Sequence, residues 1–317
     1  MRRLALAGVV VNAGIVSTGA AVRLSKSGLG CLDWPTCTTR SLVAAPRAGE
    51  PIIHTWIEFG NRTLTGVLEV VVVAVLIAAW RFRPAGLRRP DLVWLAALQP
   101  VAVLLQAVIG GVVVLTDLSP AWVAGHFLVS VAVVAAAVTL YARCTEGISQ
   151  PRSLIRTDLR LLSLAVAAVA VIMLAAGTAV TGTGPLAGAG DVPRFHLWSL
   201  TGVTQLHADI GWLLGGLAAA LALGLHFSGA PARAVRLGWT LLGLLAVQGA
   251  VGYVQYFSHL PAGLVWVHAS MSVVIWVVAL RLVFAGRDRG PLAAHASLLP
   301  PPASYPAAVR SGGQGPG

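Results

Sequence analysis

Charged side chains are scarce in this sequence. Asp, Glu, Lys and Arg together make up 10% of its 317 residues, whereas 57% are hydrophobic and the mean hydropathy is +0.82. In soluble domains, about a quarter of all residues are usually charged. The shortage excludes an ordinary soluble protein and indicates a chain that lies mostly in lipid.

Cysteine is also rare, with three residues in the chain. Cys31 and Cys37 lie in the first long loop between apolar runs, and Cys144 follows a later apolar run on the opposite side. If that loop is outside the cytoplasm, a disulfide can persist there, whereas Cys144 is expected to be a free thiol. Spacing alone leaves two free thiols or a metal site open for the outer pair.

Long apolar runs fill most of the chain. Eight of them are long enough for a helix that crosses a hydrocarbon core of ~30 Å. They span Leu4–Val22, Trp56–Trp80, Leu92–Leu115, Ala121–Tyr141, Leu161–Val180, Thr204–Leu225, Leu237–Tyr256 and Leu264–Phe284. We therefore predict an all-α integral membrane protein with eight transmembrane helices.

Acidic residues number only 11 against 22 Lys and Arg residues, so the net charge is +11. Most of the 22 Lys and Arg residues fall in alternate loops: Arg2 and Arg3; Arg81, Arg83, Arg88 and Arg89; Arg143, Arg152, Arg156 and Arg160; Arg233 and Arg236; Arg281, Arg287 and Arg289. The positive-inside rule places these loops and both termini in the cytoplasm, and the long basic loop before Pro51 counts less in that rule. This distribution favours lipid rather than nucleic acid as the partner of the positive charge.

Two stretches resemble each other. Gln106–His126 and Gln248–His268 each begin with Gln, have Gly four residues later (Gly110 and Gly252), contain a Pro-bearing turn and end with His after the same 20-residue separation. Equal spacing of polar residues in apolar sequence indicates a duplicated unit. A His within a membrane span is by default a candidate functional residue.

The charged loop Arg143–Arg160 is the expected boundary of the duplication. We predict an N-terminal four-helix half (1–143), a cytoplasmic linker (144–160), a C-terminal four-helix half (161–289) and a tail (290–317). The tail is rich in Pro, Gly, Ala and Ser and is expected to be disordered.

Polar residues form a stripe at the start of the second span. His54, Glu58, Asn61 and Arg62 are spaced so that they share one helical face. Such a stripe is expected to face a cavity or the bundle interior. For His54 and Arg62, a polar helix start at the headgroups is an equally good interpretation, whereas Glu58 lies between apolar neighbours.

The second half places histidine where the first half has Asn61. Aligning Glu58–Asn61 with Thr204–His207 gives that half two interior histidines, His207 and His268, and the first half Asn61 and His126. A single His can simply hydrogen-bond a neighbouring helix. Two at equivalent depth favour axial ligation of haem iron. Zinc is disfavoured because no Cys, Asp or Glu completes a four-ligand set in the second half.

The stretches SGLGCLDWPTC and IEFGNR, with single histidines in the fourth, sixth and eighth spans, resemble haem A synthase over residues 4–284. The resemblance implies two pseudo-symmetric four-helix bundles. The C-terminal one would hold haem b through His207 and His268. The N-terminal one would receive the substrate haem beside a Cys31–Cys37 disulfide, with Glu58 taking part in the chemistry.

The implied reaction oxidises a methyl group of haem O to the formyl group of haem A by successive hydroxylations, for haem-copper terminal oxidase. The implied setting is the cell membrane, with haem O synthase and terminal oxidase assembly factors as candidate protein partners. Two other functions fit parts of the pattern. A di-histidine b-type electron-transfer cytochrome without product chemistry shares the histidine pair, and a transporter shares the duplicated bundle.

One residue departs from the family pattern. Many relatives have His at the position of Asn61 in this sequence. We expect that His126 binds the substrate iron, either alone or with His54 approaching from about two turns away. Asn61 and Arg62 are then expected to contact the substrate, and Glu58 to move protons near the reacting methyl group.

Overall fold

The computed structural model describes residues 1–39, 41–46, 51–188, 192, 194–196 and 198–292. Within them lie eight helices long and apolar enough to cross a membrane. They are α1 (Arg2–Leu24), α2 (Ile52–Arg81), α3 (Pro90–Leu115), α4 (Pro120–Arg143), α5 (Thr157–Thr183), α6 (Leu200–Phe227), α7 (Ala232–Phe257) and α8 (Ala262–Ala285). The all-α membrane fold is confirmed. Each predicted span lies inside its helix, and the helices extend up to five residues further.

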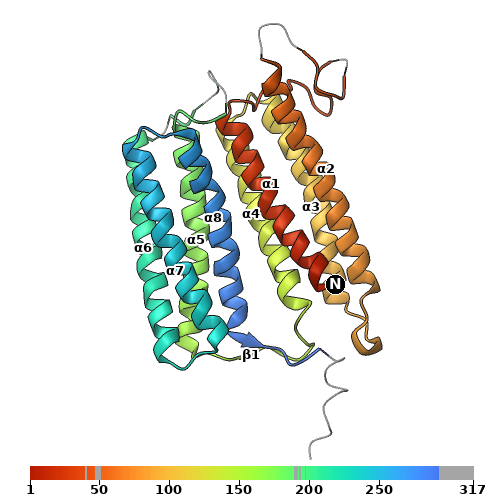
Figure 1. The fold of residues 1–317 in the computed structure, drawn as a ribbon, viewed down its shortest axis with the longest axis vertical. Coiled ribbons are helices and arrows are strands. Elements are labelled where there is room, and N and C mark those ends of the chain that lie inside the picture. The colour runs from red at the N-terminus through yellow and green to blue at the C-terminus, as the bar shows by residue number, and fades with distance from the viewer. Residues whose placement is uncertain (40, 47–50, 189–191, 193, 197, 293–317) are drawn as a thin grey trace, which may run out of the picture.

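The helices run side by side in two neighbouring groups (Figure 1). Each of α1–α4 packs against two others of its group, and α5–α8 do the same, so each group is a closed ring of four. The groups meet where α1 and α4 contact α8 and where α4 contacts α5. The pseudo-twofold relation and the division at 144–160 stay predictions. The tail from 293 onward, predicted to be disordered, lies outside the described residues.

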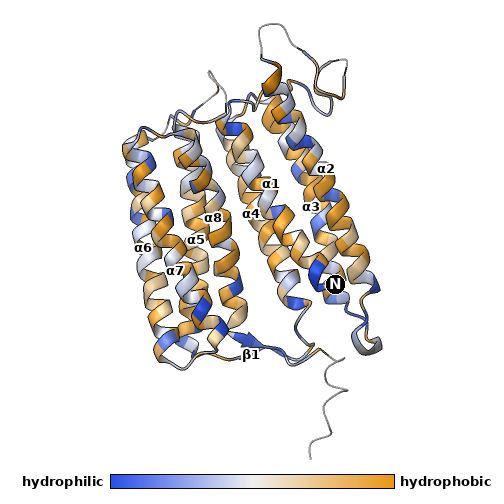
Figure 2. Ribbon diagram, in the orientation of Figure 1, coloured by the Kyte–Doolittle hydropathy of each residue, from blue (hydrophilic) through white to orange (hydrophobic). Residues whose placement is uncertain are grey.

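Hydropathy follows this arrangement. Apolar residues cover most of the helix surfaces, and many large ones are exposed, as lipid contact requires (Figure 2). The loop with Cys31 and Cys37 lies at one end of the molecule, called here the disulfide end (Figure 1). The loops after α3, α5 and α7 lie at that end too. The opposite end carries β1 (Arg152–Ser153) paired antiparallel with β2 (Arg287–Asp288) and the short 3₁₀ helix η1 (Pro84–Gly86).

The two duplicated stretches fold alike. In each, a turn with two consecutive left-handed residues reverses the chain: Asp117 and Leu118 between α3 and α4, and His259 and Leu260 between α7 and α8. Leu118 N donates to Val113 O at 2.9 Å, and Leu260 N donates to Gln255 O at 2.8 Å. The sequence repeat is thus also a repeat of backbone geometry.

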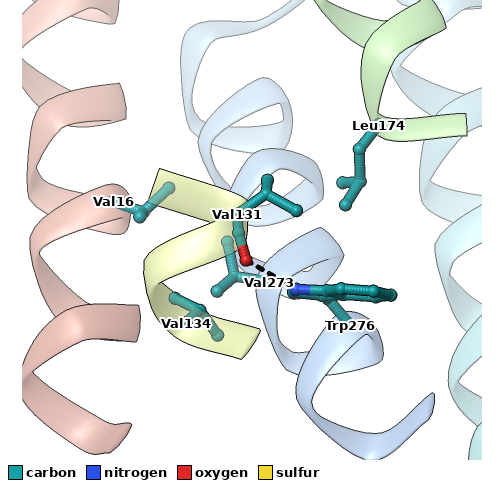
Figure 3. A pocket seen from close by; sticks show the side chains of 6 residues that line it. All are labelled: Val16, Val131, Val134, Leu174, Val273 and Trp276. Atoms are coloured by element: carbon teal, nitrogen blue, oxygen red, sulfur yellow. Dashed lines mark hydrogen bonds between the residues drawn. The ribbon is translucent and has the colours of Figure 1, made fainter. Parts of the chain in front are cut away.

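A small apolar cavity marks the junction of the two groups. Figure 3 shows it lined by Val16, Val131, Val134, Leu174, Val273 and Trp276, from α1, α4, α5 and α8, with a volume of about 10 Å³. Trp276 Nε1 donates to Val131 O at 3.0 Å and so joins α8 to α4. An apolar space of this size stays dry, so the centre of the molecule is close-packed.

Candidate haem-binding sites

His207 on α6 and His268 on α8 face each other. Their ring centroids are 6.3 Å apart and the rings are tilted by 57°. Each ring lies against a glycine of a neighbouring helix: a Cβ added at Gly177 would lie 3.4 Å from His207 Cε1, and one at Gly252 would lie 3.2 Å from His268 Cε1. Any side chain at Gly252 would crowd the His268 ring, and one larger than alanine at Gly177 would crowd the His207 ring.

The two nitrogen atoms of each ring, Nδ1 and Nε2, have different surroundings. In the described structure, Nδ1 of His207 and Nδ1 of His268 are buried and have no hydrogen-bond partner. The helix of His268 is held from α7, because Gln248 Nε2 donates to His268 O at 2.9 Å. With Nδ1 turned towards glycine, Nε2 is the atom left for a ligand.

This pair fits axial ligation of a haem iron. Two imidazoles bound to opposite sides of one metal ion at about 2 Å have ring centroids roughly 6 Å apart, close to the observed spacing. Among the described residues, no three His, Cys, Asp or Glu side chains gather as a metal-binding group. Zinc usually needs such a group, whereas a haem iron held by its porphyrin needs only the two axial ligands.

His126 on α4 repeats half of this site in the other group. A Cβ added at Gly110 would lie 3.5 Å from His126 Cε1, and Nδ1 of His126 is again buried without a partner in the described structure. Gln106 Nε2 donates to His126 O at 2.9 Å. Gln, Gly and His therefore hold the same positions here as Gln248, Gly252 and His268 do in the other group.

Asn61 takes the place of the second histidine. Its Oδ1 accepts a hydrogen bond from Thr18 Oγ1 on α1 at 2.7 Å. Gly19, the residue after Thr18, aligns with Gly177, which lies against His207. However, a Cβ added at Gly19 meets no described atom within 4 Å. An added Cβ at Gly19 would therefore meet open space, whereas one at Gly177 would meet the His207 ring.

Glu58 and Arg62 hold the disulfide loop against α2. Glu58 is 5% exposed, and its Oε2 accepts from Cys31 N at 2.8 Å while Oε1 pairs with Arg62 Nη2 at 2.6 Å. Arg62 Nη1 donates to Asp33 O at 2.9 Å and to Thr36 O at 3.0 Å. Cys31 and Cys37 form a disulfide. The polar stripe predicted on α2 therefore contacts the loop through Glu58 and Arg62 and the neighbouring helix α1 through Asn61.

Trp34 brings the same loop close to His126. A Cβ added at Gly111 would overlap the Trp34 ring, with Cδ2 only 2.5 Å away. The His126 ring lies against the preceding residue, Gly110. Gly110 and Gly111 thus accept two aromatic rings, those of His126 and Trp34.

The other histidines lie away from these sites. His54 Nδ1 is hydrogen-bonded to Ser27 Oγ at 2.8 Å in the first loop. His196, His226 and His259 are exposed, as expected for surface or interfacial positions, and His226 packs on Phe227 and Trp239. Cys144 is free and buried, as expected, and burial raises the pKa of its thiol.

Some of the site was missed by sequence reasoning. The contact of Ser27 with His54, the role of Arg62 as a donor to loop carbonyls and the position of Trp34 on Gly111 join residues far apart in the chain. Of these site features, only the glycines could have been recognised from the sequence. Gly19, Gly110, Gly177 and Gly252 all lie on the helices that precede the Asn or His positions.

The fold and the histidines define the class: a multi-pass membrane protein with a site suited to axial ligation of haem iron. Residues 2–280 match the COX15-CtaA family of cytochrome oxidase assembly protein, and the chain belongs to that family.

Several relatives carry the name "Heme A synthase". One from Halalkalibacterium halodurans is 26% identical over 308 residues, which cover 94% of this chain and 93% of the relative. One from Exiguobacterium sp. is 30% identical over 134 residues, or 42% of each chain. One from Bacillus cereus is 30% identical over 114 residues, or 36% of this chain and 34% of the relative.

Proposed function

We propose that this protein is a haem A synthase, which oxidises the methyl group of haem O to the formyl group of haem A by successive hydroxylations. The observation that carries the proposal is the imidazole pair His207–His268 at 6.3 Å, with its glycine-backed geometry repeated at His126. Family membership and the relatives' names support the same activity. The product would serve haem-copper terminal oxidase.

In this proposal the C-terminal group is the cofactor site. His207 and His268 would hold haem b, which would supply electron transfer when bound. The protein contributes position: Gly177 and Gly252 set the two ring planes, and Gln248 fixes the α8 backbone at His268.

The N-terminal group is the substrate site. His126 binds the iron of the substrate haem, and Asn61 and Arg62 line the same side of the bundle. Glu58 accepts a proton near the reacting methyl group, and its contacts to Cys31 N and Arg62 give its carboxylate a fixed position. The disulfide loop covers this end and excludes water.

Charge distribution supports a location and an orientation. Basic residues concentrate at the end opposite the disulfide, so that end and both termini face the cytoplasm of a cell membrane. The disulfide then faces the oxidising side, where it persists. Haem O synthase and terminal oxidase assembly factors are the protein partners that this activity calls for.

The test is product analysis in cells that supply haem O. Wild-type protein is expected to yield formyl-bearing haem A in the extracted porphyrins. Glu58→Gln and His126→Ala are expected to retain haem b but lose most of the product, and His207→Ala to lose haem b itself. His259→Ala, at an exposed position, serves as control.

The same experiment separates synthase from electron carrier. A di-histidine cytochrome without product chemistry would bind haem b and yield no haem A, even with substrate present. Full activity in both Glu58→Gln and His126→Ala would contradict the substrate-site assignment.

A further inference from the structure

A cavity at the end opposite the disulfide is lined by three arginines, a leucine and a threonine. It has a volume of about 280 Å³, and its walls come from the start of α7 and the end of α8: Arg233, Arg236, Leu237, Thr240 and Arg281. The cavity lies between the start of α7 and the end of α8, which are at the opposite end of these helices from the disulfide loop (Figure 1). It is therefore separate from the histidine sites.

The three arginines have no acidic partner among the described residues. Other arginines at the same end do: Arg89 and Arg143 pair with Asp91, and Arg143 and Arg287 pair with Glu146. No ion pair or hydrogen bond of the Arg233, Arg236 or Arg281 side chain is found in the part of the chain that the structure describes. Three like charges around one cavity repel each other unless an anion lies between them.

Two further features increase the positive potential. Arg233 and Arg236 lie in the first two turns of α7, where the helix dipole is already positive and basic residues are disfavoured. Arg281 is held in place, since its Cζ lies 5.5 Å from the centroid of the Tyr141 ring. Its Nε is buried without an acceptor in the described structure, and an unsatisfied buried donor is costly.

We propose that this cavity binds the phosphate group of an anionic phospholipid. Phosphate oxygens supply the acceptor that Arg281 Nε lacks, and arginine recognises phosphate through several donors at once. A lipid is the source because the cavity also has an apolar wall, Leu237, and an exposed hydroxyl, Thr240. Trp239, on the same helix, packs on His226 and is 42% exposed, as an interfacial anchor is. Basic pockets between membrane helices are suited to such headgroups.

The experiment is native mass spectrometry of the purified full-length protein with added phosphatidylglycerol or phosphatidylcholine. The test variant carries Arg233→Gln, Arg236→Gln and Arg281→Gln. The control variant carries Arg83→Gln, Arg88→Gln and Arg160→Gln, three exposed arginines of the same end outside the cavity. Both variants lose the same charge. Size-exclusion profile and bound haem report folding in each.

We expect wild type and control to retain phosphatidylglycerol in preference to phosphatidylcholine. The test variant should bind it at least tenfold more weakly, since each basic residue near a membrane surface contributes about fivefold. Arg281→Lys keeps the charge but not Nε, and should bind more weakly than wild type if the cavity is specific.

Equal weakening in both triple variants would overturn the proposal, because it would show a general charge effect. Displacement of the lipid by millimolar inorganic phosphate alone would also overturn it and reassign the cavity to a soluble phosphate compound. A test variant that fails to fold is replaced by the single variants Arg233→Gln and Arg236→Gln, which are exposed. Unchanged phosphatidylglycerol retention in both would then overturn it.

Discussion

Single glycines set the position of each functional imidazole. His126, His207 and His268 each turn Cε1 towards a glycine on an adjacent helix. In a membrane bundle, small residues let helices and rings approach closely. At the residue scale, haem binding by this protein should thus depend on residues that cannot themselves bind iron.

We predict that Gly252→Leu weakens haem b binding about tenfold, because the new side chain overlaps the His268 ring and overpacking costs ~1–3 kcal/mol. Haem per protein, measured by absorbance after purification, checks this. Gly243→Leu is the matched control, because Gly243 lies on the same helix, is exposed and has no described atom within 4 Å of an added Cβ. Equal haem content in the two variants would contradict the role of Gly252.

We predict that Asn61→His creates a second imidazole pair with His126. Gly19 has open space at the position where Gly177 meets the His207 ring, and Thr18, which now donates to Asn61, can turn away. The change is made in a His207→Ala background, so that the C-terminal site does not obscure the result. Titration with haem should give a six-coordinate low-spin spectrum and roughly tenfold tighter binding than His207→Ala alone. An identical titration in the two proteins would show that Asn61 and His126 do not share a ligand.

At the scale of elements, the first loop depends on α2 for its conformation. Arg62 donates to the carbonyl groups of Cys31, Asp33 and Thr36 and also pairs with Glu58. A loop rich in turn residues has few hydrogen bonds of its own. A single arginine therefore supplies hydrogen-bond donors to several of its backbone carbonyls. The disulfide then ties the two ends of the same short segment together.

We predict that Arg62→Gln opens this loop while the helices stay folded. Loss of charged hydrogen bonds to backbone carbonyls costs about 2 kcal/mol, so amide exchange around residues 31–37 should quicken roughly thirtyfold. Hydrogen-exchange mass spectrometry measures it. Lys26→Gln removes the same charge from an exposed position in the same loop and should leave the exchange unchanged. Unaltered exchange in Arg62→Gln would show that the disulfide alone orders the segment.

The elements were more predictable than the contacts between them. All eight helices and the repeat could be predicted, because length, apolarity and equal spacing are properties of the chain itself. Gln106 and Gln248 stood out as members of the repeat, yet the acceptors of their hydrogen bonds, the carbonyls of His126 and His268, could not be predicted. The contact of Gly177 with the His207 ring and the contacts of Arg62 with loop carbonyls depend on how the helices pack, and no local sequence pattern encodes that packing.

At the scale of the whole molecule, a polar network joins the two groups of helices at the end opposite the disulfide. Glu146, just after α4, accepts from Arg143 Nη1 at 3.1 Å and from Arg287 Nη2, just after α8, at 3.0 Å. Arg89, at the start of α3, donates to Glu146 O. The strand pair β1–β2 lies beside this network and connects the segments after α4 and α8. Elsewhere in the described structure, single hydrogen bonds join the groups: Ser17 Oγ with Ser270 Oγ at 2.6 Å, and Trp266 Nε1 to Ser17 O and Trp276 Nε1 to Val131 O, each at 3.0 Å. The network around Glu146 adds ion pairs to these contacts.

We predict that Glu146→Gln loosens the connection and lowers the apparent Tm by about 5 °C, because a partly buried carboxylate shared by two arginines leaves both less well paired. Thermal unfolding in detergent, followed by light scattering, measures the shift. Asp158→Asn is the matched control. Its ion pair with Arg156 is exposed, with side chains 59% and 71% accessible, and such surface pairs contribute little. Arg287→Gln should lower the Tm to a similar extent, and the double variant Glu146→Gln with Arg287→Gln should lose less than the sum, because both changes break the same contact. Strict additivity would instead show that Glu146 and Arg287 act separately.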